Sequence, residues 1–540
     1  MKSLRASSSL ATWVVVAALA VGCTDTGGAC EDTLDCASGG AAGHAGTGGA
    51  AGSAAAGGAA GNGGSGGSGA TAGAGGGAGS GGGSGAAGAA GSDAGTCDPS
   101  ASPGDDDCVI AEAYGVFVAP TGDDTTGTGS MAAPFASLAK GVTAAKAAGK
   151  RVYACADGGE YDEHLSLDSS SAGVEAFGAF KCSDWSFDSS LQAKVAPSGP
   201  GPALDAESIN VATRIEGFEF KAQSATAPGQ SSVAAFVKSS TALSLVRVKL
   251  VAGDGTRGAD GVTSGYAQPD NLQGGDATLS AGGTGTAYAL CPGGGTTTGG
   301  VGGGLPNAGG GLGTRAPGTT PQNAGQSGAT CASGGGGEAG EPGAPGTEGQ
   351  GATVHGALDI SGWQPKSGSA AAPGTVGQGG GGGRGGSTGG GGGGGAGGCG
   401  GAAGGGGGGG GASIALLLFN SPISLTDAVL LTGAGGDGGA GSDGQDGLFG
   451  GGKGSGTGTG SQSTFGCDGG PGGDGGPGGG GAGGLSVGIL HLGPAPTHSG
   501  GSITPGSAGA AGRGGKAGST GSAATSGVAG VAQEAREVTN

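Results

Sequence analysis

The chain has 540 residues, of which 151 are glycine, and it carries a formal net charge of −19. Glycine has no side chain to bury and loses the most backbone entropy on ordering, so a conventional hydrophobic core over the whole length is excluded. We therefore expect one moderate folded region with glycine-rich extensions. An acidic surface repels phosphate backbones, which argues against nucleic acid as a partner.

The first 22 residues read as an export signal. Lys2 and Arg5 precede an apolar run from Leu10 to Val21, which is too short to span a bilayer and suits a signal-peptide core. The run ends in "LAVGC", which resembles the bacterial lipoprotein signal box and would make Cys23 the lipidated residue. A cleaved secretory signal without lipid is the alternative. We expect an exported protein, lipid-anchored to the outer membrane or cell surface, with the membrane as a partner.

The next segments separate this anchor from any folded part. We interpret residues 23–38 as a lipid-anchored N-terminal segment and residues 39–96, which are almost entirely Gly, Ala and Ser, as a flexible tether. A coil of this composition and length has a root-mean-square span of about 40 Å.

The cysteines predict an oxidising compartment. There are eleven, and assigning Cys23 to the lipid leaves ten, which we group by closeness in sequence although connectivity cannot be deduced from sequence alone. The candidate pairs are Cys30 with Cys36, Cys97 with Cys108, Cys155 with Cys182, Cys291 with Cys331, and Cys399 with Cys467. Cys155 and Cys182 are 27 residues apart, about the spacing between successive strands of the repeat, which predicts a disulfide between neighbouring strands. Two buried free thiols are the alternative.

Folded character is expected over residues 97–265. "GVFVAP", "RVYACA", "EHLSLD" and "GVEAFGAF" predict strands, and residues 134–148 predict a helix that ends at Gly149. Short alternating strands then recur in "SINVATRIEGFEF", "SVAAFVK" and "LSLVRVKLVAG". If these strands stack, the helix covers the otherwise open first end of the stack.

A family resemblance agrees with this reading. It rests on Val118, Pro120, Gly122, Asp124, Gly127-Thr128, Pro134-Phe135, Ser137-Leu138, Gly149-Lys150, Val152-Tyr153, Tyr161 and Glu163. This spacing resembles the start of uncharacterised bacterial surface lipoproteins with a pectin-lyase-like right-handed parallel β-helix and glycine-rich insertions, as found in myxobacteria. The resemblance implies a mostly β fold, a right-handed parallel β-helix with an N-terminal capping helix, and it implies no particular activity.

One sequence motif occurs three times in the chain. Aligning Ser232, Ser413 and Ser486 gives three copies of an apolar strand, a polar corner, a second apolar stretch and glycine, and the third copy suits an edge of the stack. Chance similarity of apolar runs is the alternative. We expect a glycine-rich insert with scattered strands over 266–412, further β-helix turns over 413–506, and a Gly/Ala-rich tail over 507–540. The glycine tracts are expected to be largely irregular or disordered loops, and for "DGGPGGDGGPGG" at 468–479 either local polyglycine-II packing or disorder is expected.

Candidate sites are few. If the protein is an enzyme, the charged residues that alternate with apolar ones are the groove candidates: Glu216, Glu219, Lys221, Arg247 and Lys249. The plainer interpretation is that Glu219 and Arg247 form a surface ion pair between neighbouring turns. Asp437, Asp443 and Asp446, near "GGAGSDGQD", are weak calcium candidates because carboxylates are suitable ligands, although a solvated acidic loop is the more ordinary interpretation.

No cofactor is expected beyond that calcium, and "GLFGGGKG" lacks the final Ser or Thr of a nucleotide-binding loop, so nucleotide is not expected as a partner. The leading hypothesis is a surface-anchored glycine-rich lipoprotein with a binding or structural role, whose partners include glycans or other envelope proteins and which has no identified catalytic site. The alternative is an extracellular polysaccharide lyase or glycoside hydrolase.

Overall fold

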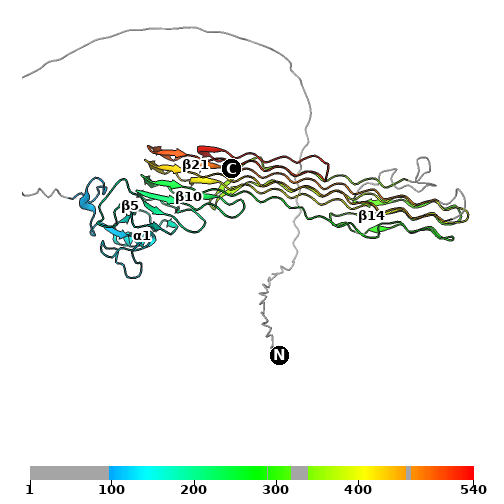
Figure 1. The fold of residues 1–540 in the computed structure, drawn as a ribbon, viewed down its shortest axis with the longest axis horizontal. Coiled ribbons are helices and arrows are strands. Elements are labelled where there is room, and N and C mark those ends of the chain that lie inside the picture. The colour runs from blue at the N-terminus through cyan, green and yellow to red at the C-terminus, as the bar shows by residue number, and fades with distance from the viewer. Residues whose placement is uncertain (1–96, 289, 318–337, 458–463, 540) are drawn as a thin grey trace, which may run out of the picture. The chain divides into compact units, whose positions relative to one another are not determined.

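A computed structural model describes residues 97–288, 290–317, 338–457 and 464–539. All of them belong to one compact unit, Gly91–Asn540. The predicted signal segment, Cys23, Cys30, Cys36 and the predicted tether therefore lie outside the described residues. The fold of the described part is mostly β, with parallel sheets (Figure 1).

The first elements are a 3₁₀-helix, Asp107–Val109, a strand β1, Gly115–Val118, and an α-helix α1, Leu138–Ala148. The side chain of Ser137 caps the start of α1, and Gly149 ends it with φ of 63°. The helix begins later than the predicted residue 134 because Asp124 accepts hydrogen bonds from the N–H groups of Ala136 and Ser137 instead. Its apolar face packs on β1 and the neighbouring strands, as the sequence predicts.

Three parallel sheets make up the body of the fold. The first sheet contains, in spatial order, β1, β2 (Arg151–Cys155), β5 (Glu175–Phe180), β8 (Thr213–Glu216), β11 (Leu243–Val246), β19 (Ser424–Thr426) and β22 (Thr497–Ser499). The second sheet contains β3 (Glu160–Tyr161), β6 (Ala193–Val195), β9 (Phe218–Lys221), β12 (Lys249–Val251), β20 (Val429–Leu431) and β23 (Ser502–Thr504). The third sheet contains β4 (Leu165–Leu167), β7 (Leu204–Glu207), β10 (Ser232–Lys238), β18 (Ser413–Phe419), β21 (Ser486–Leu492) and β24 (Ala532–Glu537).

From β2 onward the chain visits the first, second and third sheets in turn, and we call this arrangement the strand stack. Its interior is filled by Leu, Ile, Val, Phe and Ala side chains from all three sheets. One passage of the chain through the three sheets is called a turn of the stack. Each turn contributes a few apolar residues, so it needs the turns above and below it to bury them.

The predicted alignment of the three repeated phrases is confirmed. Ser232 pairs in register with Ser413, and Ser413 pairs with Ser486. The hydroxyl oxygens of Ser232 and Ser413 accept hydrogen bonds from the N–H groups of Gly253 and Gly433, at the points where the chain leaves the stack. The serine recurs because it closes the same corner in successive turns. The third copy consists of β21, β22 and β23. Strands β22 and β23 are edge strands of the first and second sheets, whereas β21 is not an edge strand, because β24 pairs with it in the third sheet.

The glycine tracts leave and re-enter the stack at one corner. They connect β12 to β18, β20 to β21, and β23 to β24, and their described residues form what we call the glycine array. Short antiparallel pieces lie within the first tract: β13 (Ala287–Tyr288), β14 (Thr296–Thr298) and β15 (Thr314–Ala316), and a hairpin of β16 (Gly356–Asp359) and β17 (Gly362–Pro365).

The expectation of irregular loops is wrong for the described residues of these tracts. The N–H groups of Gly398, Gly401, Gly404 and Gly407 donate to the carbonyl oxygens of Gly470, Gly473, Gly476 and Gly479, each bond at 2.9 Å. A hydrogen-bonding position every three residues is the repeat of polyproline II chains, which lie side by side here (Figure 1).

Glycine is required where these chains approach each other. A Cβ atom added at Gly401 would lie 2.0 Å from the carbonyl oxygen of Gln445, and one at Gly404 would lie 2.2 Å from that of Ser442. No side chain fits at such positions, so the array is held by backbone hydrogen bonds between closely spaced chains.

Three disulfides join described residues. Cys97–Cys108 and Cys155–Cys182 form as expected, and the second has a Cα separation of 4.9 Å beside the β2–β5 pairing. Cys291 bonds to Cys399, 108 residues away in sequence. The predicted pairings of Cys291 with Cys331 and of Cys399 with Cys467 are therefore wrong, and Cys467 is disulfide-bonded elsewhere. Closeness in sequence fails here because the array brings distant segments together.

Candidate functional site: the charged faces of the strand stack

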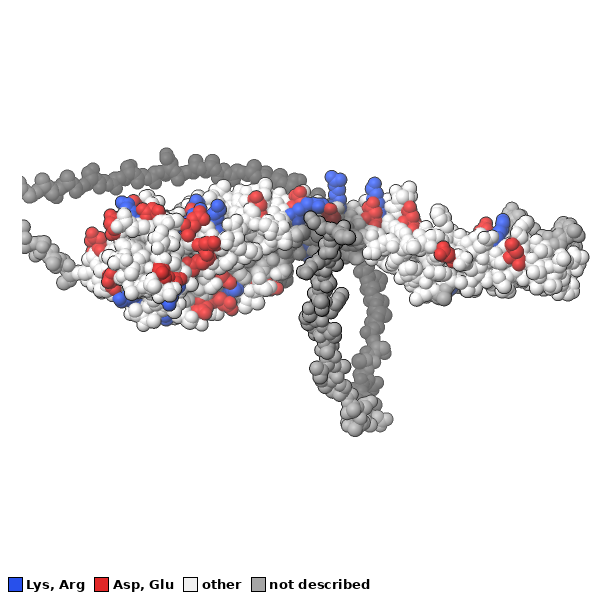
Figure 2. All heavy atoms as spheres, turned by 60° about the horizontal axis from the view of Figure 1, so that its bottom comes forward, with Lys and Arg blue, Asp and Glu red and all other residues white. Residues whose placement is uncertain are grey.

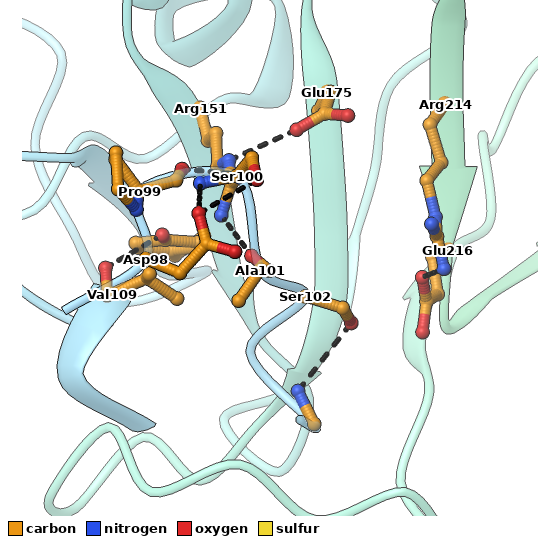
Figure 3. Close-up of polar contacts among 12 residues, drawn as sticks. Asp98, Pro99, Ser100, Ala101, Ser102, Val109, Arg151, Glu175, Arg214 and Glu216 are labelled. Carbon is orange, nitrogen blue, oxygen red and sulfur yellow. Dashed lines mark hydrogen bonds and ion pairs between the residues drawn. The ribbon is translucent and has the colours of Figure 1, made fainter. Parts of the chain in front are cut away.

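On the face shown in Figure 2, charged side chains are more crowded on the strand stack than on the glycine array. On the outer face of the first sheet, Arg151 of β2 forms an ion pair with Glu175 of β5, Nε to Oε2 at 2.9 Å. The same guanidinium donates to the carbonyl oxygens of Ala101 (2.6 Å) and Pro99 (2.9 Å), which ties residues 99–101 to the sheet (Figure 3). Arg151 thus uses three of its donors in structural contacts.

Glu216 lies further along the same sheet and is clamped by two arginines. Its Oε1 is 2.5 Å from Nη2 of Arg247, its Oε2 contacts Arg214, and the residue is 4% exposed. The two guanidinium groups also lie over aromatic rings, Arg214 over Phe177 at 5.7 Å and Arg247 over Phe187 at 5.3 Å. This cluster lines one side of a surface depression of about 550 Å³.

The other groove candidates lie on the second sheet. Glu219 of β9 is in register with Lys249 of β12, and their carboxylate and ammonium groups are 3.0 Å apart. Lys221 is an exposed residue at the end of β9. The predicted pair of Glu219 with Arg247 is wrong, because Gly217 turns the corner between β8 and β9 and places Glu216 and Glu219 on different sheets.

The chemistry open to these residues follows from their partners. General acid–base work needs a carboxyl group free to exchange a proton with a bound substrate. Glu216 and Glu219 instead hold basic groups of neighbouring turns, Arg247 and Lys249, in ion pairs. The ion pairs thus link neighbouring turns of the stack, and the depression lies beside Glu216.

The weak calcium candidates do not converge. Asp437, Asp443 and Asp446 each accept a hydrogen bond from a backbone N–H group of the adjacent chain, at Ala510, Lys516 and Ser519. Their carboxylates are thus spread along an extended chain. Among the described residues, the one group of potential ligands close together is Cys97, Asp106 and Cys108, and its two sulfurs form a disulfide.

Sequence reasoning missed a cavity under the β16–β17 hairpin. Leu358 and Trp363, a cross-strand pair, pack on the outer face of the third sheet beside Phe236. The signal available in the sequence is "GALDISGWQP", a short alternating stretch with a turn inside the glycine-rich insert.

Comparison with protein-family models, with curated proteins and with solved structures found no match for this chain. Within the described residues, no helix has the length and apolar character needed to cross a membrane. The function therefore has to be inferred from the geometry of this chain.

Proposed function

We propose that the chain is a lipid-anchored surface protein of the cell envelope with a binding or structural role, built on a right-handed parallel β-helix. The three parallel sheets, visited in turn, support the β-helix. The export signal predicted from the sequence and the disulfides support an extracellular location.

One observation carries the structural part of the proposal. All three glycine tracts leave successive turns at the same corner and hydrogen bond to one another every three residues. Such an array uses no reactive side chains, and it extends the ordered surface beyond what the small hydrophobic core alone can support. A long ordered surface is what an envelope protein that binds or spaces its partners requires.

The anchor follows from Cys23. In this proposal, acyl chains on this residue supply the membrane affinity. Envelope glycans or other envelope proteins are the partners that such an anchored surface meets.

The test is fractionation of cells that express the full chain and the Cys23→Ser variant. The wild-type chain is expected in the membrane fraction after a high-salt wash, with an acylated N-terminal peptide by mass spectrometry, and the variant is expected in the soluble fraction. Retention of the variant in washed membranes contradicts the lipid anchor.

A further inference from the structure

A cavity of about 300 Å³ lies between the β16–β17 hairpin and the outer face of the third sheet. Its walls come from four segments of the chain, with Phe236 and Leu417 on the sheet, Trp363 on the hairpin, and Pro202 and Gln230 in loops. None of the residues that line it has an ionisable side chain. In a chain of net charge −19, a neutral lining indicates a neutral ligand.

The aromatic walls are fixed before any ligand arrives. Phe236 is 7% and Trp363 is 8% exposed, and both pack in one apolar cluster. The Lys238 ammonium group lies 5.0 Å from the centre of the Phe236 ring and is itself held by Asp205 at 3.0 Å. Preorganised apolar walls with a few polar groups are characteristic of small-molecule sites.

Donors are available among the residues that line the cavity. The Oε1 atom of Gln230 accepts hydrogen bonds from the N–H groups of Thr226 and Ala227, which leaves its NH₂ group as a donor. The hydroxyl oxygen of Ser231 accepts from the N–H group of Ala412, so its proton can be donated. The buried Nε1–H of Trp363 has no hydrogen-bond partner among the described residues, which is uncommon for a buried indole.

We propose that this cavity binds a single neutral pyranose ring of an envelope glycan. A sugar ring has an apolar C–H face for the aromatic walls and hydroxyl oxygens for the donors, and it carries no charge. The volume suits one ring, whereas an extended peptide needs a longer groove. The proposal deepens the binding role proposed above and rests on the surface location.

The test titrates the purified full-length mature chain with methyl glycosides of glucose, galactose and N-acetylglucosamine, by calorimetry and by saturation-transfer NMR. Galacturonate serves as the charged counterpart, and a proline-rich peptide as the alternative ligand. Trp363→Phe keeps a ring but removes the N–H group. The control is Phe449→Ala, because Phe449 is 79% exposed and lies in the glycine array.

The expected result is binding of at least one neutral glycoside, weakened about tenfold by Trp363→Phe, with no change in the control. Galacturonate is expected to bind at least tenfold more weakly. Three results overturn the proposal. Galacturonate binds as tightly as the neutral glycosides, the peptide binds more tightly than they do, or the folded wild-type chain binds none of the neutral glycosides. Membrane attachment through Cys23 is measured separately, so failure of sugar binding and failure of the surface location give different results.

Discussion

The strand stack and the glycine array are ordered by opposite means. In the stack, side chains such as Phe218 and Leu250 fill the interior, and burial of apolar area supplies the driving force. In the array, the absence of side chains lets backbones approach, and hydrogen bonds between chains replace the hydrophobic core.

The difference shows why the array depends on the stack. A backbone hydrogen bond contributes about 1 kcal/mol net, whereas fixing one residue costs about 1–2 kcal/mol of backbone entropy and most for glycine. The array therefore has little stability of its own. Anchoring both ends of each tract in neighbouring strands, and adding the Cys291–Cys399 disulfide, reduces the entropy that ordering must overcome.

The largest effect is expected from cutting that disulfide. In the loop-entropy model, a closed loop of about 100 residues contributes about 4.7 kcal/mol, so Cys291→Ser with Cys399→Ser should unfold much of the array and leave the stack intact. Hydrogen exchange should rise over residues 266–317 and stay slow in β10 and β18. The control is Cys155→Ser with Cys182→Ser, which should loosen the first turns of the stack instead. If hydrogen exchange over residues 266–317 is equally slow in the wild type and in the Cys291→Ser, Cys399→Ser variant, the order of the array does not depend on this disulfide.

A matched pair of glycines tests the packing of backbones. A Cβ atom at Gly451 would lie 1.8 Å from the carbonyl oxygen of Leu272, whereas one at Gly452 would have no atom within 4 Å. Gly451→Ala should destabilise the array by on the order of 3 kcal/mol, and Gly452→Ala should be neutral or slightly stabilising. Limited proteolysis within residues 433–457 measures both. If the two variants are cleaved at the same rate, close backbone approach does not hold the array.

The charged faces of the stack offer a smaller effect and a test of the enzyme alternative. Glu216→Gln leaves two arginines without their shared carboxylate and should lower the unfolding free energy by about 2 kcal/mol, whereas Glu219→Gln, at a more exposed pair, should cost less than about 1 kcal/mol. Chemical denaturation measures both changes. Turnover of pectic, alginate or peptidoglycan substrates, with or without calcium, that disappears in Glu219→Gln would favour a lyase or hydrolase.

The smallest effect is expected at the aspartates of the array. Asp443 accepts a hydrogen bond from the N–H group of Lys516 at 2.6 Å, so Asp443→Ala should cost about 1 kcal/mol, and Asp443→Asn, which keeps an acceptor oxygen, less than about 0.5 kcal/mol. Calcium at millimolar concentration should leave the melting temperature of the wild-type chain unchanged. A rise in melting temperature that Asp443→Asn abolishes would restore the calcium site.

Local patterns in the sequence determined much of the stack. Helix α1, most of the strands, the register of Ser232, Ser413 and Ser486, and the Cys155–Cys182 bridge were all predictable, because apolar period, capping residues and strand spacing act over short distances. The sequence indicated that the charged groove candidates point outward, but it did not indicate which ion pairs they form. Those partners depend on the corner at Gly217, which places Glu216 and Glu219 on different sheets.

The tertiary structure decided the rest. The composition of a glycine tract does not show whether the tract is disordered or packed. Its order depends on which other tracts lie beside it, and this is set by the strands in which the tract begins and ends. For that reason the Cys291–Cys399 bridge, the aspartate contacts to adjacent chains and the cavity beneath Trp363 could not be inferred from the sequence. Each joins segments far apart in sequence, and their meeting depends on the geometry of the whole stack.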